Sequence, residues 1–415
     1  MVSAHGDRRL PEILSGPDTR IILICCSASK VRSSRFVDEV IEISNHRSCS
    51  NFAKELIANR ALIESLNGWI IFGRDDDMYQ IGRSDLTLEL KLKLLPVKKP
   101  EAIHIPGSKC ELVSLAKTAH YKMPISENLD SWSELFKKLE TFPTPFIIKS
   151  ERGSGGVSVR RVNNSIELAK LPLPESWYPI VIQEFITDDL RAVDALFREG
   201  HLVAWMYCDN FQFPTEFGPS VSRRYVEPPA LDFEQDLIKF GKATGAHGFA
   251  NCSFFYFPST DSHLLFEVDL RTNAWHHLGR IFGIEWKALM QDPLDEVLME
   301  IKSPQNLSPN GYRIVLWQRY IEYAIQNRKW KILYRLLRMK RSERSPIDFQ
   351  DEAINRGLLI GLFRLIPLAF AKFLFGFLPV DLKRRLKSQG TTARVATIIA
   401  ADYIATPMNL VSRKS

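Results

Sequence analysis

The sequence contains few cysteines, and none of them forms a spaced metal or redox motif. No two of the six cysteines are separated as CxxC or CxxxxC, and most lie in apolar runs. A thiol in such a run usually behaves as a small buried hydrophobic side chain. We therefore expect reduced thiols and a cytoplasmic protein.

The sequence pattern also predicts neither a signal peptide nor an uninterrupted membrane-spanning run. Residues 1–20 are polar and contain proline, without the apolar core of a secretory signal. The most apolar stretch, residues 356–380, is interrupted by Arg364, Pro367 and Lys372. A helix that crosses a bilayer needs about 20 largely apolar residues. The sequence thus favours a protein that is neither secreted nor embedded in a membrane.

A glycine-rich segment is present, but it lacks the strand-to-helix order of a P-loop or a Rossmann fingerprint. Residues 146–162 contain two β-rich runs around a glycine-laden loop, which predicts an antiparallel hairpin. Gly153, Gly155 and Gly156 allow backbone N–H groups to converge on one phosphate chain, and Lys149 ends the entering strand. Taken alone, the segment fits an ordinary flexible hairpin equally well.

Charge is unevenly distributed along the 415 residues. The formal net charge is +7, from 55 Lys and Arg against 48 Asp and Glu. Residues 311–415 hold 20 basic and 7 acidic side chains, which leaves a net charge of −6 for the first 310 residues. Such asymmetry predicts that the C-terminal part meets an anionic partner, either a membrane surface or a nucleic acid.

The N-terminal part alternates between strand and helix patterns. Apolar runs at residues 20–29, 40–43 and 68–72 predict strands, and residues 51–66 carry helical spacing. This order predicts a small α/β domain over residues 20–105, after a flexible N-terminus at residues 1–19. Asp75, Asp76 and Asp77 follow the last strand, where open α/β sheets bind ligands. A solvated acidic loop is the alternative.

The middle of the chain mixes helices with strands in hairpins. Helices are expected within residues 105–124 and at residues 132–139 and 232–244, and strands at residues 180–186, 191–198, 201–207, 248–257 and 264–268. Residues 211–229 are rich in proline and glycine and are predicted to form a long functional loop. A helix N-terminus is expected at His276 and His277, which lack the spacing of a zinc site.

Three charged side chains alternate near the end of one predicted strand. Glu267, Asp269 and Arg271 are two residues apart, so all three project from one face. Two such carboxylates suit Mg²⁺ held between protein and phosphates, and Arg271 suits a phosphate or acyl-phosphate. A salt-bridged strand end is the alternative reading of the same pattern.

Four motifs follow one another along the chain. They are a lysine before a helix, the lysine and glycine hairpin, a Gln-Glu-Phe-Ile strand and a Glu-x-Asp-x-Arg strand. This order over residues 105–285 resembles the ATP-grasp superfamily, in the style of biotin carboxylase and carbamoyl-phosphate synthetase. The resemblance implies a mixed α/β and α+β protein. A small pre-ATP-grasp domain at residues 20–105 would precede an ATP-grasp domain at residues 106–300. A basic, helical C-terminal region would occupy residues 311–415.

The resemblance also implies roles for single residues. Lys109 and Lys149 would contact ATP phosphates, and the loop from Ser150 to Gly156, including Ser154, would close over them. The strand that carries Glu184, Phe185 and Ile186 would form the hinge that contacts the edge of the adenine. An acidic residue just after it would hold the ribose, and the candidates are Asp189 and Asp188. Glu267 and Asp269 would bind Mg²⁺, and Arg271 would assist catalysis together with Lys149.

Two departures from the family pattern stand out. Asp269 occupies the position of the usual asparagine, and Leu270 that of a common proline; an aspartate keeps the oxygen ligand and adds charge. One strand earlier, Ser253 stands where the family usually has an acid, and serine is a poor metal ligand.

The implied activity is an ATP- and Mg²⁺-dependent ligase that joins a carboxylate to an amine through an acyl-phosphate. Selectivity for these small-molecule or glycan substrates is expected in residues 211–229 and in the N-terminal domain. Arg223 and Arg224 are either anion clamps or part of a solvent-exposed basic loop. Because of Ser253, a degenerate relative that binds nucleotide without catalysis is one alternative. A phosphotransferase that acts on a hydroxyl is another, since the same ATP site would suit it.

The C-terminal region combines aromatic, apolar and basic residues. Residues 314–338 mix aromatics with Lys and Arg, and residues 356–387 join an apolar run to Lys383, Arg384 and Arg385. This pattern is typical of a peripheral helix on an anionic cytoplasmic membrane face, which would favour a membrane-borne substrate such as a lipid-linked glycan. Packing against the body or a partner subunit is the equal alternative. Nucleic acid is not expected, and no oligomeric state is indicated.

Overall fold

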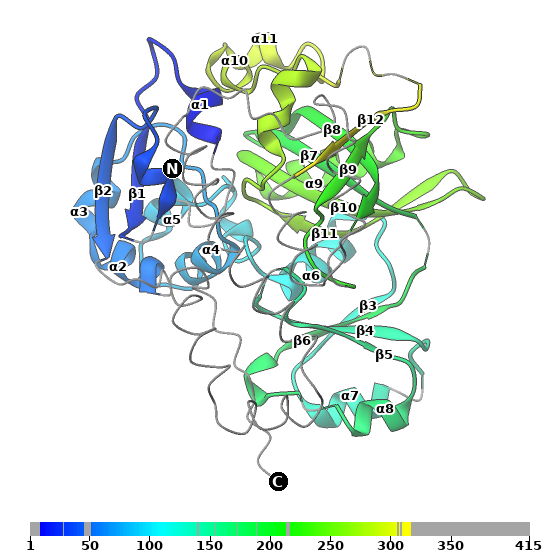
Figure 1. Ribbon diagram of the computed structural model, residues 1–415. Helices are drawn as coiled ribbons and strands as arrows, with labels where there is room; N and C mark the ends of the chain where they lie inside the picture. The colour runs from blue at the N-terminus through cyan, green and yellow to red at the C-terminus, as the bar shows by residue number, and fades with distance from the viewer. Residues whose placement is uncertain are drawn as a thin grey trace, which may run out of the picture.

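The computed structural model describes residues 9–316, apart from residues 28, 45–50, 139–140, 154, 172, 188, 213–215, 305–306 and 308. These residues form an N-terminal α/β unit, a small four-stranded sheet and a large six-stranded sheet (Figure 1). The described helices include none that is both long and apolar enough to cross a membrane. The membrane prediction for residues 356–387 lies outside the described part of the chain.

The N-terminal unit pairs β1 (Ile22–Cys26) with β2 (Glu39–Ser44) in parallel. Short helices surround this pair: α1 (Leu10–Leu14), η1 (Lys30–Ser33), α2 (Phe52–Ala58), α3 (Arg60–Ser65), α4 (Asp75–Gly82), α5 (Leu88–Leu94) and η3 (Pro100–Ala102). The helix expected at residues 51–66 is divided at Asn59, because its side chain accepts a hydrogen bond from the Leu62 N–H at 3.2 Å and caps α3.

Two expectations for this unit are wrong. Residues 68–72 do not form a strand, since only Phe72 is a β-bridge residue: Ile71 and Phe72 are buried, and the Phe72 carbonyl accepts hydrogen bonds from Thr272. The acidic residues that follow are not a solvated loop, since they form the first turn of α4, where negative charge is favourable.

The cysteines are mostly as expected. Cys26 is disulfide-bonded, so the expectation of reduced thiols is wrong at this position. Four other described cysteines are free, namely Cys25, Cys110, Cys208 and Cys252.

The small sheet has the order β3 (Ser126–Leu129), β6 (Ile180–Glu184), β4 (Phe146–Ser150) and β5 (Val159–Val162), with antiparallel pairing throughout. This confirms the predicted hairpin at residues 146–162. Helices α7 (Trp132–Lys138) and α8 (Ser165–Ala169) and the turn η4 (Glu175–Trp177) accompany the sheet, at the bottom of Figure 1. Leu135, Phe146 and Leu168 are fully buried and form its core.

The large sheet has the order β11 (Ser262–Asp269), β10 (Gly248–Phe257), β7 (Asp189–Arg198), β8 (His201–Gln212), β9 (Ser222–Tyr225) and β12 (Tyr312–Val315). β9 lies within residues 211–229, so the prediction of one long loop there is wrong in part. The backbone of residues 222–225 is satisfied by β8 and β12 on either side.

Helices cover both faces of the large sheet. Helix α9 (Asp232–Thr244) has the predicted bounds, and its apolar residues share one core with β10, β11 and the N-terminal unit. A second core joins the sheet to α1 and to η5 (His276–Phe282), α10 (Trp286–Gln291) and α11 (Leu294–Val297). Helix α6 (Lys109–Ala119) contacts β3 and β6 of the small sheet as well as α9 and β11. It therefore joins the two sheets at the junction described below.

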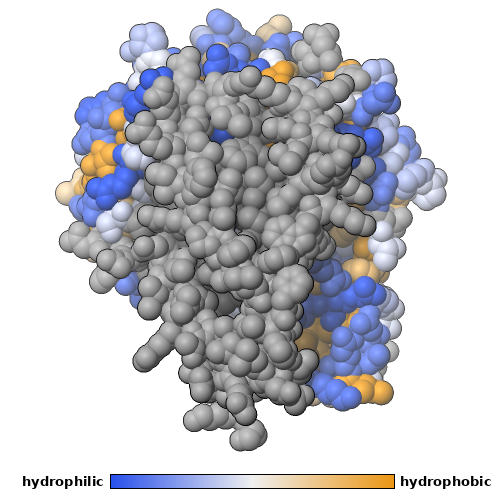
Figure 2. Space-filling model, in the orientation of Figure 1, coloured by the Kyte–Doolittle hydropathy of each residue, from blue (hydrophilic) through white to orange (hydrophobic). Residues whose placement is uncertain are grey.

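The visible described surface is mainly hydrophilic, with small hydrophobic patches (Figure 2). The most exposed large apolar side chains are scattered over several elements, for example Val157, Ile166 and Met299. Scattered apolar residues of this kind are normal on a protein surface.

Candidate functional site

One pocket lies where the small sheet meets β11 of the large sheet. It encloses about 500 Å³, including open solvent at its mouth. Strands β4 and β6, the start of α6 and the end of β11 all contribute, and Asp75 reaches it from α4. The lining residues are Asp75, Gly107, Ser108, Lys109, Leu112, Val113, Lys149, Gly153, Val181, Gln183, Phe266, Glu267, Val268 and Asp269.

Lys149 is a buried cation in this pocket. Its Nζ donates to Oε1 of Gln183 at 2.9 Å and lies 5.0 Å from the centre of the Phe266 ring. Burial lowers the pKa of Lys149 to about 8, although the Glu267 carboxylate opposes this shift. A buried charge with a neutral hydrogen-bond partner is costly unless an opposite charge accompanies it. This part of the pocket therefore favours an anionic ligand.

The glycine loop closes one side of the same region. Lys109, in the first turn of α6, donates from Nζ to the Gly153 carbonyl at 2.8 Å. At Gly156 a Cβ atom would lie only 1.8 Å from the Phe217 carbonyl oxygen, so only glycine fits there. Ser154 lies outside the described residues. The loop glycines have φ values of 119°, 65° and 74° at Gly153, Gly155 and Gly156.

The entering end of this loop is fixed to the N-terminus of α6. Glu151 is buried, and its carboxylate accepts from Ser108 Oγ at 2.6 Å and from the Cys110 N–H at 2.9 Å. Ser150, one residue earlier, donates to the Trp177 carbonyl at 3.3 Å. A carboxylate at a helix N-terminus satisfies free N–H groups and meets the positive end of the helix dipole.

A second tether joins the loop to the N-terminal unit. The Arg152 guanidinium binds the Asp76 carboxylate, with Nε to Oδ1 at 2.9 Å and a further contact from Nη2. The Tyr79 ring lies 5.1 Å from this guanidinium. The consecutive loop residues Glu151 and Arg152 are thus held to α6 and α4, respectively.

Strand β11 supplies two carboxylates on one face, as predicted. Glu267 lies opposite Ser253 of β10, and Asp269 lies opposite Asn251. A β-bulge beside Ser253 inserts one residue into the pairing, which allows Phe266 to line the pocket next to Glu267.

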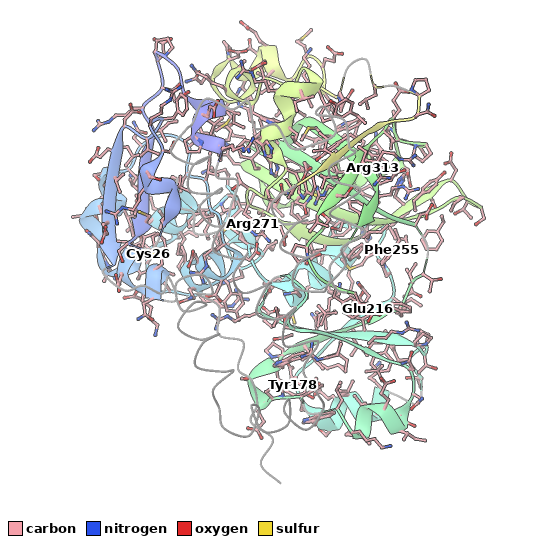
Figure 3. All side chains as sticks on the ribbon, in the orientation of Figure 1. Cys26, Tyr178, Glu216, Phe255, Arg271 and Arg313 are labelled. Carbon is pink, nitrogen blue, oxygen red and sulfur yellow. The ribbon has the colours of Figure 1, made fainter. Side chains whose placement is uncertain are left out.

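Arg271 crosses from the large sheet to the N-terminal unit (Figure 3). Its Nε donates to Asp75 Oδ2 at 2.6 Å, and its Nη2 donates to Asp269 Oδ2 at 2.7 Å. Arg271 does not itself line the pocket, but both carboxylates that it binds do. The predicted salt bridge at the strand end is therefore confirmed for Asp269, whereas no ion pair of Glu267 occurs within the described residues.

Nearby positive charge does not fully compensate the carboxylates of Asp75, Glu267 and Asp269. Burial raises the pKa of Asp269; Arg271 opposes this shift, and the Asp75 and Glu267 carboxylates add to it. Oδ1 of Asp75 is buried and has no hydrogen-bond partner in the described part of the chain. A cation shared by these oxygens would relieve both conditions.

The donor set fits Mg²⁺ held jointly with phosphates. Within the described residues, no three His, Cys, Asp or Glu side chains form a complete metal site of their own. Mg²⁺ in proteins is usually bound by one or two carboxylates, and phosphate oxygens and water complete its octahedron. Glu267 and Asp269 match this requirement.

Solved structures share this architecture, although no protein-family model and no curated protein sequence matches the chain. The biotin carboxylase domain of 2-oxoglutarate carboxylase from Hydrogenobacter thermophilus, in complex with MgADP, has a TM-score of 0.55 and 15% identity, over 72% of this chain and 69% of that chain. N5-carboxyaminoimidazole ribonucleotide synthetase from Thermus thermophilus has a TM-score of 0.54 and 11% identity, over 71% and 77%. L-amino acid ligase from Bacillus licheniformis has a TM-score of 0.50 and 16% identity, over 72% and 74%. All three are ATP-grasp enzymes. The chain has the ATP-grasp fold.

The predicted ATP-grasp hinge lies beside the pocket and not in its lining. Glu184 ends β6, and its Oε1 accepts from the Ile125 N–H at 2.8 Å. Phe185 and Ile186 follow the strand, and Asp189 begins β7. None of the four predicted hinge and ribose residues lines the pocket, so their roles remain predictions.

The two candidate substrate arginines are already paired. Arg223 is buried on β9, where its Nη1 donates to both oxygens of Asp194 at 3.1 and 2.9 Å. Arg224 binds Asp209 through two parallel hydrogen bonds of 2.8 and 2.7 Å. Neither arginine belongs to a free basic loop, because each pairs with a carboxylate of the same sheet, Arg223 with Asp194 on β7 and Arg224 with Asp209 on β8.

Sequence reasoning did not assign Gln183 and Phe266 to the site. Gln183 orients Lys149 and is itself held by Ser126 Oγ at 2.8 Å. Phe266 enters the pocket through the β-bulge, which alternation along a strand does not reveal. Asp75 was noted as part of an acidic run, but its partner Arg271 lies 196 residues away.

Proposed function

We propose that this chain is an ATP-dependent ligase that joins a carboxylate to an amine through an acyl-phosphate. The convergence of Lys109, Lys149, Glu267 and Asp269 on one pocket is the observation that carries the proposal. These residues come from α6, β4 and β11, and together they offer both cations for phosphates and oxygens for Mg²⁺. The structural neighbours include enzymes that act on carboxylate and amine substrates.

The phosphate chain of ATP would lie between the glycine loop and β11. Lys149 would exchange its neutral partner Gln183 for a phosphate oxygen, and Lys109 would release the Gly153 carbonyl and do the same. Glu267 and Asp269 would hold Mg²⁺, which neutralises charge on the phosphates when bound.

The adenine ring has an apolar place to bind in the same pocket. Leu112, Val113, Val181 and Phe266 line it, and Phe266 stacks on Phe255 with ring centres 4.4 Å apart. A purine gains stability by contact with such aromatic and apolar surfaces. The hinge residues beside β6 would then meet the adenine edge.

The reaction has two balanced steps. A carboxylate oxygen of the first substrate attacks the γ-phosphorus, the bond between this phosphorus and the β,γ-bridging oxygen breaks, and ADP leaves. The nitrogen of the amine then attacks the acyl carbon, loses a proton and expels inorganic phosphate. Arg271 would stabilise the acyl-phosphate, since a guanidinium binds phosphate oxygens with two hydrogen bonds.

ADP formation that requires both a carboxylate and an amine tests this proposal. Purified protein is incubated with Mg²⁺, ATP and paired panels of carboxylates and amines, and ADP is measured. Hydroxylamine in place of the amine should trap the acyl-phosphate as a hydroxamate. Lys149→Met is the control, and it should abolish both signals. No ADP and no hydroxamate with any member of the panels would contradict the proposal.

A nucleotide-binding scaffold without catalysis is the second candidate. Ser253 favours it, because this residue lies directly opposite Glu267 and offers no carboxylate at that position. Tight binding of ATP with no turnover under all conditions, but with loss of binding in Lys149→Met, would select this candidate over the ligase.

The lipid-linked glycan remains a proposal for the substrate. It rests on the apolar and basic sequence of residues 356–387, which lie outside the described residues. Flotation with vesicles that contain anionic lipid, compared with neutral vesicles, tests the membrane part. Equal recovery of the full chain and of a chain truncated before residue 356 would contradict it.

A further inference from the structure

Arg271 is carried by a short turn that leaves the end of β11. The Arg271 N–H donates to the Asp269 carbonyl at 2.9 Å and begins this turn. On one side, the Thr272 N–H and Oγ1 both donate to the Phe72 carbonyl of the N-terminal unit, at 3.2 and 3.3 Å. The turn is therefore fastened to the segment that leads into Asp75.

Asn273 fastens the other side of the turn. Its Nδ2 donates to Asp194 Oδ1 at 2.7 Å, and its Oδ1 accepts from the Trp275 N–H at 2.8 Å. Its own backbone N–H donates to Nδ1 of His276 at 3.1 Å. One side chain thus connects the backbone of the turn to a buried carboxylate of the sheet.

Asp194 is a rigid point of attachment. The side chain is fully buried, and it also accepts from Arg223, from Tyr225 Oη at 3.3 Å and from Asn251 Nδ2 at 2.9 Å. Burial favours the neutral acid, but the Arg223 guanidinium and the other donors hold the pKa of Asp194 below its usual value. A fully satisfied buried network of this kind resists displacement.

We propose that Asn273 is a positioning residue for Arg271, and that its bond to Asp194 sets where the guanidinium meets the γ-phosphate. This inference rests on the proposed function. Arg271 donates from Nε to Asp75, from Nη2 to Asp269 and from Nη1 to the Thr272 carbonyl at 3.4 Å, so a small movement of the turn changes these bonds. Displacements of about 1 Å are enough to impair a site built for one geometry.

The γ-phosphate contribution can be measured without a known acceptor substrate. The dissociation constants of ATP and ADP are determined by calorimetry with Mg²⁺, and their ratio reports the contacts to the γ-phosphate. Arg271→Ala should reduce the preference for ATP about tenfold, the effect of one charge-assisted hydrogen bond. Asn273→Ala should reduce it about fivefold, and should leave the affinity for ADP within about twofold of that of the unaltered protein.

Asn251→Ala is the matched control. Asn251 donates to the same Asp194 oxygen, but it lies within β10 and not in the turn. If Asn273 acts through the turn, Asn251→Ala changes the ATP-to-ADP ratio by less than about twofold. A loss equal to that of Asn273→Ala would assign the effect to the Asp194 network as a whole and overturn the inference.

A double-mutant cycle separates positioning from general damage. In the Arg271→Ala background, Asn273→Ala should have no further effect on the ratio, because the group it positions is absent. A full additional loss would overturn the inference. Should Asn273→Ala fail to fold, Asn273→Ser serves instead, since its hydroxyl can accept from Trp275 but is too short to reach Asp194.

Failure of the inference and failure of the proposed function give different results. If Arg271→Ala lowers the preference for ATP and Asn273→Ala does not, the positioning role is wrong and the nucleotide site stands. If the unaltered protein binds neither nucleotide, the proposed function is wrong and the inference falls with it.

Discussion

Two groups of charged side chains lie on the same face of the large sheet and are organised in opposite ways. Asn251 pairs with Asp194 on one side and with Asp269 on the other, so the two groups are neighbours across β10. Around Asp194 both carboxylate oxygens have several donors. Around the pocket, Oδ1 of Asp75 has no partner within the described residues, and Lys149 donates to one neutral amide oxygen.

The difference separates a structural role from a binding role. A buried network in which every group is hydrogen-bonded contributes to a unique fold. A buried group without a partner costs free energy, and its persistence calls for a ligand or a functional reason. We therefore assign the Asp194 group to stability and the pocket group to binding. Each of the following variants tests this assignment.

The largest expected effect is on stability, from Asp194→Ala. This change leaves the Arg223 guanidinium buried without its counter-ion, and it should lower the free energy of unfolding by about 3–5 kcal/mol. Denaturant titration of the two proteins measures the change. A loss below about 1 kcal/mol would show that the Asp194 group is not a structural centre.

Lys149→Met should have the opposite effect. The pKa of Lys149 falls from 10.5 to about 8 in the native protein. At about 1.4 kcal/mol per pKa unit, the buried cation costs up to about 3 kcal/mol, so its removal should stabilise the protein near neutral pH. Between about pH 8 and pH 10.5 the unfolded chain binds more protons than the native one, so the stability of the unaltered protein rises with pH.

The difference in the free energy of unfolding between Lys149→Met and the unaltered protein tests the sign of this effect. The advantage of Lys149→Met should be largest below about pH 8 and should vanish above about pH 10.5. Denaturant titrations of both proteins across this range measure it. A difference in the free energy of unfolding that does not change with pH would mean that burial does not destabilise the charged form of Lys149. The assignment of the pocket group to binding would then lose its support.

Ser253→Asp should strengthen the metal site. A third carboxylate opposite Glu267 should raise the apparent affinity for Mg²⁺ in the presence of ATP about tenfold. Magnesium titrations of ATP binding measure it, with Ser253→Asn as the neutral control of similar size. Equal affinities in the aspartate and asparagine variants would place Ser253 outside the metal site.

The smallest effect is expected from the tether between the glycine loop and α4. Arg152 is half exposed, so the Arg152–Asp76 pair is worth about 0.5 kcal/mol of stability. Arg152→Ala and Asp76→Ala should each speed the release of nucleotide by about two- to threefold, and the double variant should add nothing. Stopped-flow release of a fluorescent ATP analogue measures the rates. Additive effects would show that the two residues act independently.

Much of the fold followed from local pattern. The hairpin at residues 146–162, the bounds of α9 and the shared face of Glu267 and Asp269 depend on periodicity and turn residues, which are local properties. Contacts between distant segments were not accessible in this way. The pairing of Asp75 with Arg271, for example, joins residues in different parts of the chain, and only the packed structure brings them together.

The errors have physical causes of the same kind. Residues 68–72 are apolar enough for a strand, yet the Phe72 carbonyl is taken by the turn after β11. Arg223 lies in a proline- and glycine-rich stretch that predicts a loop, yet a buried carboxylate on β7 stabilises it within a strand. Alternation along β11 misses Phe266, because the β-bulge shifts the pairing by one residue.

Calorimetric titration of ATP in the presence and absence of Mg²⁺ tests the central claim most directly, when the unaltered protein is compared with Lys149→Met. The account predicts that the unaltered protein binds ATP and that Mg²⁺ strengthens this binding. It predicts that Lys149→Met remains folded but binds ATP about 100-fold more weakly, as expected for loss of a buried charge-assisted contact. Equal ATP affinity in the two proteins, or no binding by the unaltered protein, would contradict the account.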